Sequence, residues 1–175
     1  LLLYRNASAL PRAYVTPHWE AAEDYTAAMA WLIGDGAKRS AVPVVEGAAA
    51  SSGSAAGALT PVEIEEDGPN RISMSIPPGL GGGMLVISDT WDEGWHAWID
   101  GAPADILVAN GCQRALRLPS RATRVELRYQ PPGWLPGLWT SLAALTVLLC
   151  WAGVTYRRRS ADSGGVQGSR GARTT

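Results

Sequence analysis

The organisation of this chain depends on residues 133–156, which read GWLPGLWTSLAALTVLLCWAGVTY and contain no acidic residue, basic residue or histidine. A helix over residues 135–154 alone would be about 30 Å long at roughly 1.5 Å rise per residue, which matches the hydrocarbon thickness of a bilayer. The alternative is a buried helix of a soluble protein, but a core helix of this length usually carries a polar face. The stretch therefore predicts a transmembrane helix over residues 133–156.

Aromatic and basic side chains stand near the ends of this predicted span, where rings and cations meet lipid headgroups. The predicted membrane anchors are Trp134, Trp139, Trp151, Tyr156, Arg157, Arg158 and Arg159. Because clustered arginines mark the cytoplasmic side of a span, we expect residues 1–132 outside the cytoplasm and residues 157–175 inside it, with the lipid bilayer as a partner. Residues 157–175 contain too little apolar material for a core and predict a disordered cytoplasmic tail.

Composition and topology narrow the functional classes. The net charge of the 175 residues is -1, and the arginines are scattered or lie beside the span, so we expect no nucleic-acid partner. Cys112 lies outside the predicted span and Cys150 inside it, so we expect no disulfide between them. An external domain before a last span needs something upstream to export it. We therefore expect a C-terminal fragment of a longer multi-pass protein, with upstream transmembrane helices of the same parent chain as partners.

Residues 1–132 carry mainly β-strand patterns. In residues 1–40 we expect an extended segment and then an amphipathic helix over residues 16–34, with Trp19, Tyr25 and Met29 on the apolar face that packs on the β-domain. Residues 41–132 show about seven short apolar runs separated by turn residues, which predicts an antiparallel β-sandwich. Residues 47–58, GAAASSGSAAGA, predict a flexible loop within it. The expected fold class is mainly β: an extracytoplasmic antiparallel β-sandwich with one flanking helix, followed by a single C-terminal transmembrane helix.

Most of the candidate chemistry falls in residues 88–101, which read SDTWDEGWHAWIDG. In a functional interpretation, the tryptophan rings stack on the apolar face of a sugar while the carboxylates accept hydrogen bonds from its hydroxyls. In a structural interpretation, Trp95, Ala97 and Ile99 fill the sandwich core, His96 and Trp98 face outward, and the Asp-Gly pair at 100–101 makes a hairpin turn. We favour the structural interpretation on the pattern alone.

The site prediction follows from this stretch and one later arginine. The residues predicted to form a glycan-binding or structural motif are Asp89, Trp91, Gly94, Trp95, Trp98, Asp100, Gly101 and Arg114. We expect Arg114 to form a structural ion pair with Asp89 or Asp100. No second histidine or cysteine has ligand spacing to His96, so we predict no metal site and no cofactor. No nucleophile elbow, phosphate loop or Cys–His pair is present, and we assign no catalytic residue.

Several segments resemble the C-terminal part of the YfhO-type bacterial membrane proteins. The segments that carry the resemblance are Leu10-Pro11-Arg12-Ala13-Tyr14, Leu85-Val86-Ile87-Ser88-Asp89-Thr90, Gly94-Trp95, Asp100-Gly101, Asn110, Arg114-Ala115 and Val125-Glu126-Leu127-Arg128-Tyr129-Gln130-Pro131. Their order and spacing are similar to the family over most of residues 1–156. The resemblance implies a multi-pass parent protein in the bacterial cell membrane, with an architecture like that of membrane glycosyltransferases that use lipid-linked sugars.

The resemblance also implies that the catalytic acid lies in an early outward loop of the parent, outside this fragment. The expected role is therefore accessory or acceptor-positioning, with a lipid-linked sugar or a cell-envelope polymer such as a teichoic acid as the ligand. Two alternatives stay open. The chain could be a membrane-anchored, non-enzymatic carbohydrate-binding module, or a structural β-module that steadies the bundle of spans.

Overall fold

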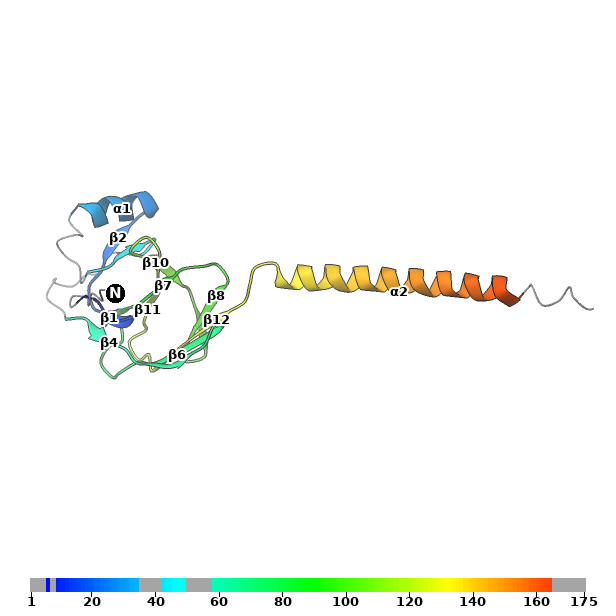
Figure 1. Ribbon diagram of the computed structural model, residues 1–175. Coiled ribbons are helices and arrows are strands. Elements are labelled where there is room, and N and C mark those ends of the chain that lie inside the picture. The colour runs from blue at the N-terminus through cyan, green and yellow to red at the C-terminus, as the bar shows by residue number, and fades with distance from the viewer. Residues whose placement is uncertain (1–5, 7–8, 35–41, 50–57, 165–175) are drawn as a thin grey trace, which may run out of the picture. The chain divides into compact units, whose positions relative to one another are not determined.

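The computed structural model describes residues 6, 9–34, 42–49 and 58–164. The chain divides into two compact units, Leu1–Pro132 and Gly133–Thr175. Within the described residues, the first unit contains two β-sheets and one short helix, and the second contains one long helix (Figure 1). The fold class is therefore mainly β, as the strand patterns predict.

The first sheet has seven strands in the order β2-β3-β10-β11-β7-β1-β4. Their bounds are β1 Ala13–Thr16, β2 Glu20–Ala22, β3 Val44–Glu46, β4 Thr60–Pro61, β7 Met84–Thr90, β10 Leu107–Ala109 and β11 Gln113–Arg117. All neighbours are antiparallel except β2 and β3, which run parallel. The four consecutive apolar residues from Met84 to Ile87 are buried in β7, because both faces of this sheet are covered.

The second sheet has five strands in the order β5-β6-β12-β8-β9. Their bounds are β5 Ile64–Asp67, β6 Arg71–Ser75, β8 Trp95–Ile99, β9 Ala102–Ala104 and β12 Arg124–Tyr129. In β12 the buried Val125 and Leu127 alternate with the exposed Arg124 and Arg128. This period of two places one face of the sheet in the core and the other in solvent.

The main core lies between the two sheets, as a β-sandwich requires. It joins Val15, Leu85 and Leu116 from the first sheet to Ile72, Met74 and Leu127 from the second, among others. A second cluster, which includes Tyr14, Trp19 and Val86, covers the opposite face of the first sheet. Alternate residues of β1 and β7 therefore enter different clusters.

The predicted helix over residues 16–34 is too long at its N-terminal end. The helix α1 spans only Tyr25–Ile33, and the carboxylate of Asp24 caps it by accepting a hydrogen bond from the Ala27 N–H at 2.9 Å. Thr16 instead ends β1, and residues 20–22 form β2, because these segments find strand partners in β7 and β3. Tertiary pairing here outweighs the local helical spacing, and Trp19 is buried under the first sheet rather than on a helix face.

The N-terminal part of the chain belongs to the sandwich itself. Because β1 pairs with both β7 and β4, Ala13–Thr16 form part of the first sheet. The helix α1 packs Ala28 against Ala22 of β2 and Val44 of β3, beside which it lies in Figure 1. In the predicted loop 47–58, residues 50–57 lie outside the described residues, while Ala49 accepts a hydrogen bond from the Trp19 indole at 2.8 Å.

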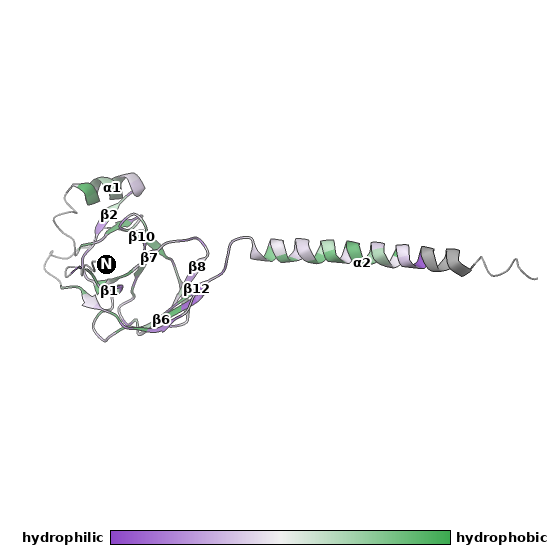
Figure 2. Cartoon of the chain, viewed as in Figure 1, coloured by the Kyte–Doolittle hydropathy of each residue, from purple (hydrophilic) through white to green (hydrophobic). Residues whose placement is uncertain are grey.

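The second unit contains helix α2, Trp134–Gly164, of which Trp134–Arg157 is long and apolar enough to cross a membrane. Figure 2 shows apolar residues along most of this span. Its hydroxyl groups are satisfied within the helix: Thr140 donates to the Pro136 carbonyl at 2.8 Å and Thr146 donates to the Leu142 carbonyl at 2.8 Å. Such internal bonding suits a lipid environment, which offers no water to polar groups.

The predicted disordered tail begins too early. Helix α2 continues beyond Tyr156 to Gly164, and the residues after that lie outside the described part of the chain. The extension has a local reason, since arginine and alanine in residues 157–161 are good helix formers. The length and apolar composition of Trp134–Arg157 support membrane association. The side of the membrane on which each end of the helix lies stays a prediction.

Candidate functional site

A cavity of about 570 Å³ lies where the predicted motif folds back on itself. Three segments line it: the turn of residues 91–93, strand β8, and residues 103–106 at and after β9. Strand β9 is an edge strand of the second sheet, so the cavity borders an edge that no described strand covers. We call it the Trp cavity, because Trp91, Trp95 and Trp98 all line it.

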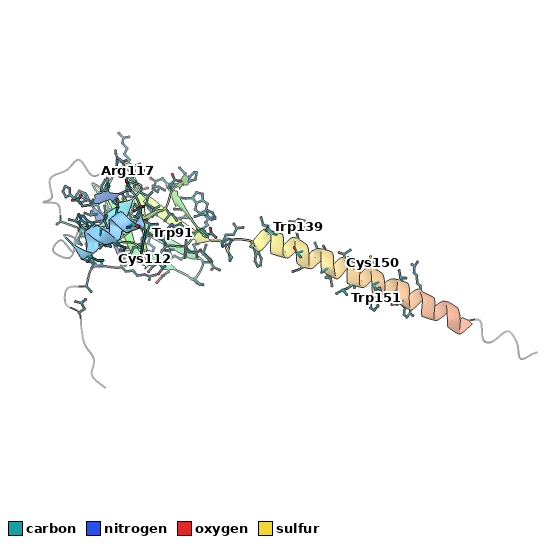
Figure 3. The ribbon with its side chains drawn as sticks, turned by 90° about the horizontal axis from the view of Figure 1, so that it is seen from above. Trp91, Cys112, Arg117, Trp139, Cys150 and Trp151 are labelled. Atoms are coloured by element: carbon teal, nitrogen blue, oxygen red, sulfur yellow. The ribbon has the colours of Figure 1, made fainter. Side chains whose placement is uncertain are left out.

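Trp91 is the most accessible anchor of the Trp cavity. Its side chain is 40% exposed, although it follows directly after the buried strand β7. Its backbone N–H donates to the Cys112 carbonyl at 2.7 Å, and the two residues lie close together in Figure 3. The hydrogen bond fixes the backbone of Trp91, while its side chain stays exposed to solvent.

The turn after Trp91 depends on Gly94. The Asp92 carboxylate accepts a hydrogen bond from the Gly94 N–H at 2.8 Å, and the Gly94 carbonyl accepts one from the Gln130 N–H at 2.8 Å. A Cβ on Gly94 would lie 2.6 Å from the Tyr129 ring and 2.8 Å from the Gln130 carbonyl oxygen. Only a glycine permits this close approach of the turn to the end of β12.

Trp95 is held between two neighbours. Its ring lies 5.2 Å from the Tyr129 ring, centre to centre, and the Arg114 guanidinium carbon lies 4.2 Å from the centre of the Trp95 ring. Trp95 also packs against the core cluster between the sheets. Because Trp95 also lines the Trp cavity, these contacts fix part of the lining.

Arg114 is buried behind Trp95, with 4% of its surface exposed. Its Nε donates to the Thr90 carbonyl at 3.1 Å, and its Nη2 lies 3.3 Å from the Asp89 carboxylate. Its Nη1 is buried without a hydrogen-bond partner among the described residues. Burial lowers the pKa of the guanidinium, and the Asp89 charge opposes that shift. The predicted ion pair of Arg114 therefore forms with Asp89 and not with Asp100.

Asp89 joins Arg114 to a second arginine. Arg12 binds Asp89 through Nε and Nη2, each at 3.0 Å, and also binds Asp67 through Nη2 at 3.1 Å. Hydrogen bonding to Arg12 lowers the pKa of the Asp67 carboxyl. Because Asp67 belongs to β5 and Asp89 to β7, this network of two arginines and two aspartates connects the two sheets.

His96 and Trp98 point away from the core, as the alternation of β8 predicts. The Arg128 guanidinium carbon lies 5.2 Å from the centre of the Trp98 ring, and Arg128 is paired with Glu126 at 3.0 Å. His96 is exposed and lines the Trp cavity together with Trp98.

Asp100 and Gly101 form the β8–β9 hairpin turn and do not line the Trp cavity. Both residues have positive φ, 50° and 83°, as a two-residue hairpin of this kind requires. The Asp100 carboxylate accepts hydrogen bonds from the Thr123 hydroxyl at 2.6 Å and the Arg124 N–H at 2.8 Å. These bonds lower the pKa of Asp100.

The structure thus separates the predicted motif into three groups. Trp91, Trp95 and Trp98 line the cavity, with Gly94 shaping its turn. Asp89 and Arg114 lie behind Trp95, and the Asp-Gly pair at 100–101 supports the hairpin. Sequence reasoning missed Asp105 and Ile106, which also line the cavity. The hairpin turn signal at 100–101 was the one available indication, because it folds residues 102–104 back against β8.

No protein-family model and no curated protein sequence matches the chain. Among solved structures, the chain is similar to the cryo-EM structure of the arabinofuranosyltransferase AftD from mycobacteria, with 25% sequence identity and a TM-score of 0.41 over 58% of this chain and 8% of that chain. A mutant of that enzyme shows 24% identity with the same TM-score and coverage. The chain therefore spans about 8% of the length of these enzymes.

Fold and site together define a two-sheet β-domain with a tryptophan-lined cavity, followed in the chain by a helix of membrane-spanning length. The resemblance to YfhO-type proteins stays a prediction, since no family model matches.

Proposed function

We propose that this chain is the C-terminal extracytoplasmic domain and last membrane span of a multi-pass, glycosyltransferase-like protein of the bacterial cell envelope, and that its β-domain binds a glycan. The proposed role is to position an acceptor or a sugar chain, without a catalytic residue of its own. One observation carries the proposal: three tryptophans and three carboxylates line a single cavity.

The lining suits a sugar chemically. A sugar ring has an apolar C–H face, which stacks on an indole, and a rim of hydroxyls, which donate hydrogen bonds to carboxylates. Trp91 offers an exposed ring, while Asp92, Glu93 and Asp105 offer acceptors. A cavity of about 570 Å³ also lies within the usual range of about 300–1,000 Å³ for ligand sites.

The contacts behind the cavity fix one of its three tryptophan rings in advance. Trp95 is held by Arg114 and Tyr129 before any ligand arrives, so ordering of that ring adds little entropy cost on binding. The same strand that carries Tyr129 leads into α2, which begins five residues later at Trp134. A glycan bound in the Trp cavity is therefore bound by a domain tethered to the membrane-length helix.

A second candidate function is a structural β-module. The Arg12, Asp67, Asp89 and Arg114 network favours it, since this network joins the two sheets and contacts Trp95 from behind. The two candidates differ at Trp91, whose exposed ring contributes little to the core. A structural module would tolerate its loss, whereas a glycan-binding domain would lose affinity.

The test uses the full 175-residue chain in phosphatidylcholine nanodiscs, titrated calorimetrically with neutral hexasaccharides of glucose, mannose and galactose. We expect at least one to bind, and Trp91→Ala to weaken that binding by about tenfold or more, as loss of a stacked ring does. Trp139→Ala, the same change in α2, is the matched control and should leave binding unchanged. Flat titrations with all three sugars and a folded protein would contradict glycan binding.

The accessory role has a separate test in the longer protein that we expect to contain this chain. There, Trp91→Ala should raise the acceptor concentration that gives half-maximal sugar transfer and leave the maximal rate nearly unchanged. Transfer kinetics identical to those of the unaltered protein would argue for a binding or structural module unconnected to catalysis.

A further inference from the structure

The ionisable side chains that line the Trp cavity are three acids and one histidine. Asp92 and Glu93 come from the turn after β7, Asp105 follows β9, and His96 lies on β8. Among the described residues that line the cavity, none is a lysine or an arginine. With a neutral histidine, the lining therefore carries three negative charges.

The arginines closest to the tryptophan rings form their ion pairs with carboxylates outside the cavity lining. Arg114, behind Trp95, belongs with Arg12 to a network that contains two aspartates, so its positive and negative charges balance. Arg128, beside Trp98, is paired with Glu126 at 3.0 Å. Each arginine that contacts a ring of the cavity already has a carboxylate partner.

The three acids differ in whether their side chains hold the turn after β7. Asp92 holds the turn by accepting the Gly94 N–H. All three acids are exposed, and Glu93 and Asp105 come from two segments on either side of the β8–β9 hairpin in the sequence. Glu93 and Asp105 are therefore the acids that a ligand meets without breaking the Asp92–Gly94 hydrogen bond of the turn.

We propose that the Trp cavity selects uncharged glycans and excludes glycans that carry carboxylate or phosphate groups. This inference rests on the proposed function and specifies its ligand class. Hydroxyls donate to the lining carboxylates, whereas an anionic group is repelled by them and loses hydration in a lining that holds no lysine or arginine. At about 7 Å in a water-like dielectric, one like charge weakens binding about threefold, so Glu93 and Asp105 together weaken it nearly tenfold.

The expected ligand is thus a neutral envelope polysaccharide or oligosaccharide and not a polymer with a phosphate backbone. This proposal differs from the expectation of a teichoic acid, which the family resemblance suggests and which stays a prediction. Stacking of the sugar ring on Trp91 accounts for the affinity, and the lining acids account for the preference for uncharged over anionic glycans.

The test compares each neutral hexasaccharide with its C6-oxidised, uronate counterpart on the full chain in phosphatidylcholine nanodiscs. At about 20 mM salt we expect the uronate to bind about fivefold to tenfold more weakly, and at about 500 mM salt the gap should narrow, because salt screens charges over a few ångströms. In the double variant Glu93→Gln and Asp105→Asn, the uronate should gain affinity while the neutral sugar changes little. Glu63→Gln, which removes an acid between β4 and β5, is the matched control.

Each outcome decides the inference. The exclusion of anionic glycans would be wrong if uronates bound the unaltered chain as tightly as neutral sugars do. It would also be wrong if the difference in affinity between the two sugars were the same in the double variant. Either result would leave glycan binding itself intact. If neither form binds, glycan binding itself fails, and the selectivity fails with it.

Discussion

The guanidinium carbon of Arg114, on β11 of the first sheet, lies 4.2 Å from the centre of the Trp95 ring, on β8 of the second sheet. The Asp89 carboxylate lies 3.3 Å from Nη2 of the same guanidinium and also forms an ion pair with Arg12. Trp95 therefore belongs both to the lining of the Trp cavity and to the contacts that connect the two sheets. This arrangement explains why the motif of residues 88–101 looked both structural and functional.

Replacing Arg114 should destabilise the β-domain. Arg114→Leu removes the ion pair with Asp89, the bond to the Thr90 carbonyl and the stacking on Trp95. We expect a loss of about 2–3 kcal/mol, below the full cost of breaking a buried pair because Asp89 keeps Arg12 as a partner. Urea unfolding of the full chain in detergent micelles, followed by tryptophan fluorescence, measures it. Arg117→Leu on the same strand is exposed and should change stability by less than about 0.5 kcal/mol; equal effects would contradict a special role for Arg114.

Trp95→Ala should cost about 3 kcal/mol, as large core truncations do. Its ring packs on the core cluster and against Tyr129 and Arg114. Trp91→Ala should cost much less stability, since the Trp91 side chain is 40% exposed. The same urea titration compares the two variants. If Trp91→Ala proved the more destabilising change, the assignment of Trp91 to ligand binding and of Trp95 to the core would be wrong.

Gly94→Ala tests the close approach at the turn. The new Cβ would lie 2.6 Å from the Tyr129 ring and 2.8 Å from the Gln130 carbonyl oxygen, and this backbone atom cannot move aside easily. We expect a loss of about 1–3 kcal/mol, typical of overpacking, together with weaker glycan binding because the turn carries Trp91. Gly137→Ala is the control, because a Cβ there meets nothing within 4 Å. An unfolding midpoint unchanged by Gly94→Ala would exclude the steric argument.

Asp100 should make the stability of the chain depend on pH in the acid range. Its pKa is lowered in the folded chain, chiefly by the Thr123 hydroxyl, from an ordinary value of 3.8. The ionised carboxylate therefore stabilises the fold above that value, and the contribution is lost as the pH falls through the lowered pKa. Asp100→Asn keeps a residue that tolerates positive φ and removes the charge.

The difference in unfolding midpoint between Asp100→Asn and the unaltered chain should accordingly be largest near about pH 6 and shrink toward about pH 2.5. Urea titrations at several pH values measure this difference. A constant difference across the range would show that the carboxylate charge does not stabilise the turn.

Much of the fold was predictable from local patterns. The alternation in β12 and the Asp-Gly pair at 100–101 predicted a strand and a hairpin, and the structure contains both. The helix over residues 16–34 was predicted too long because its spacing also fits strands, and only the partners β7 and β3 decide between the two. The clustering of Trp91, Trp95 and Trp98 was visible in the sequence, whereas Asp105 joins them only through the hairpin.

By itself, the sequence determined that the chain has a β-rich region and one helix of membrane-spanning length, because strand alternation and apolar length are properties of consecutive residues. Only the tertiary structure decided that Arg114 pairs with Asp89 and that Arg12 joins both to Asp67. Those residues are up to 102 positions apart (114 − 12), and strand order brings them together. Side-chain contacts across two sheets depend on that pairing, which no local pattern encodes.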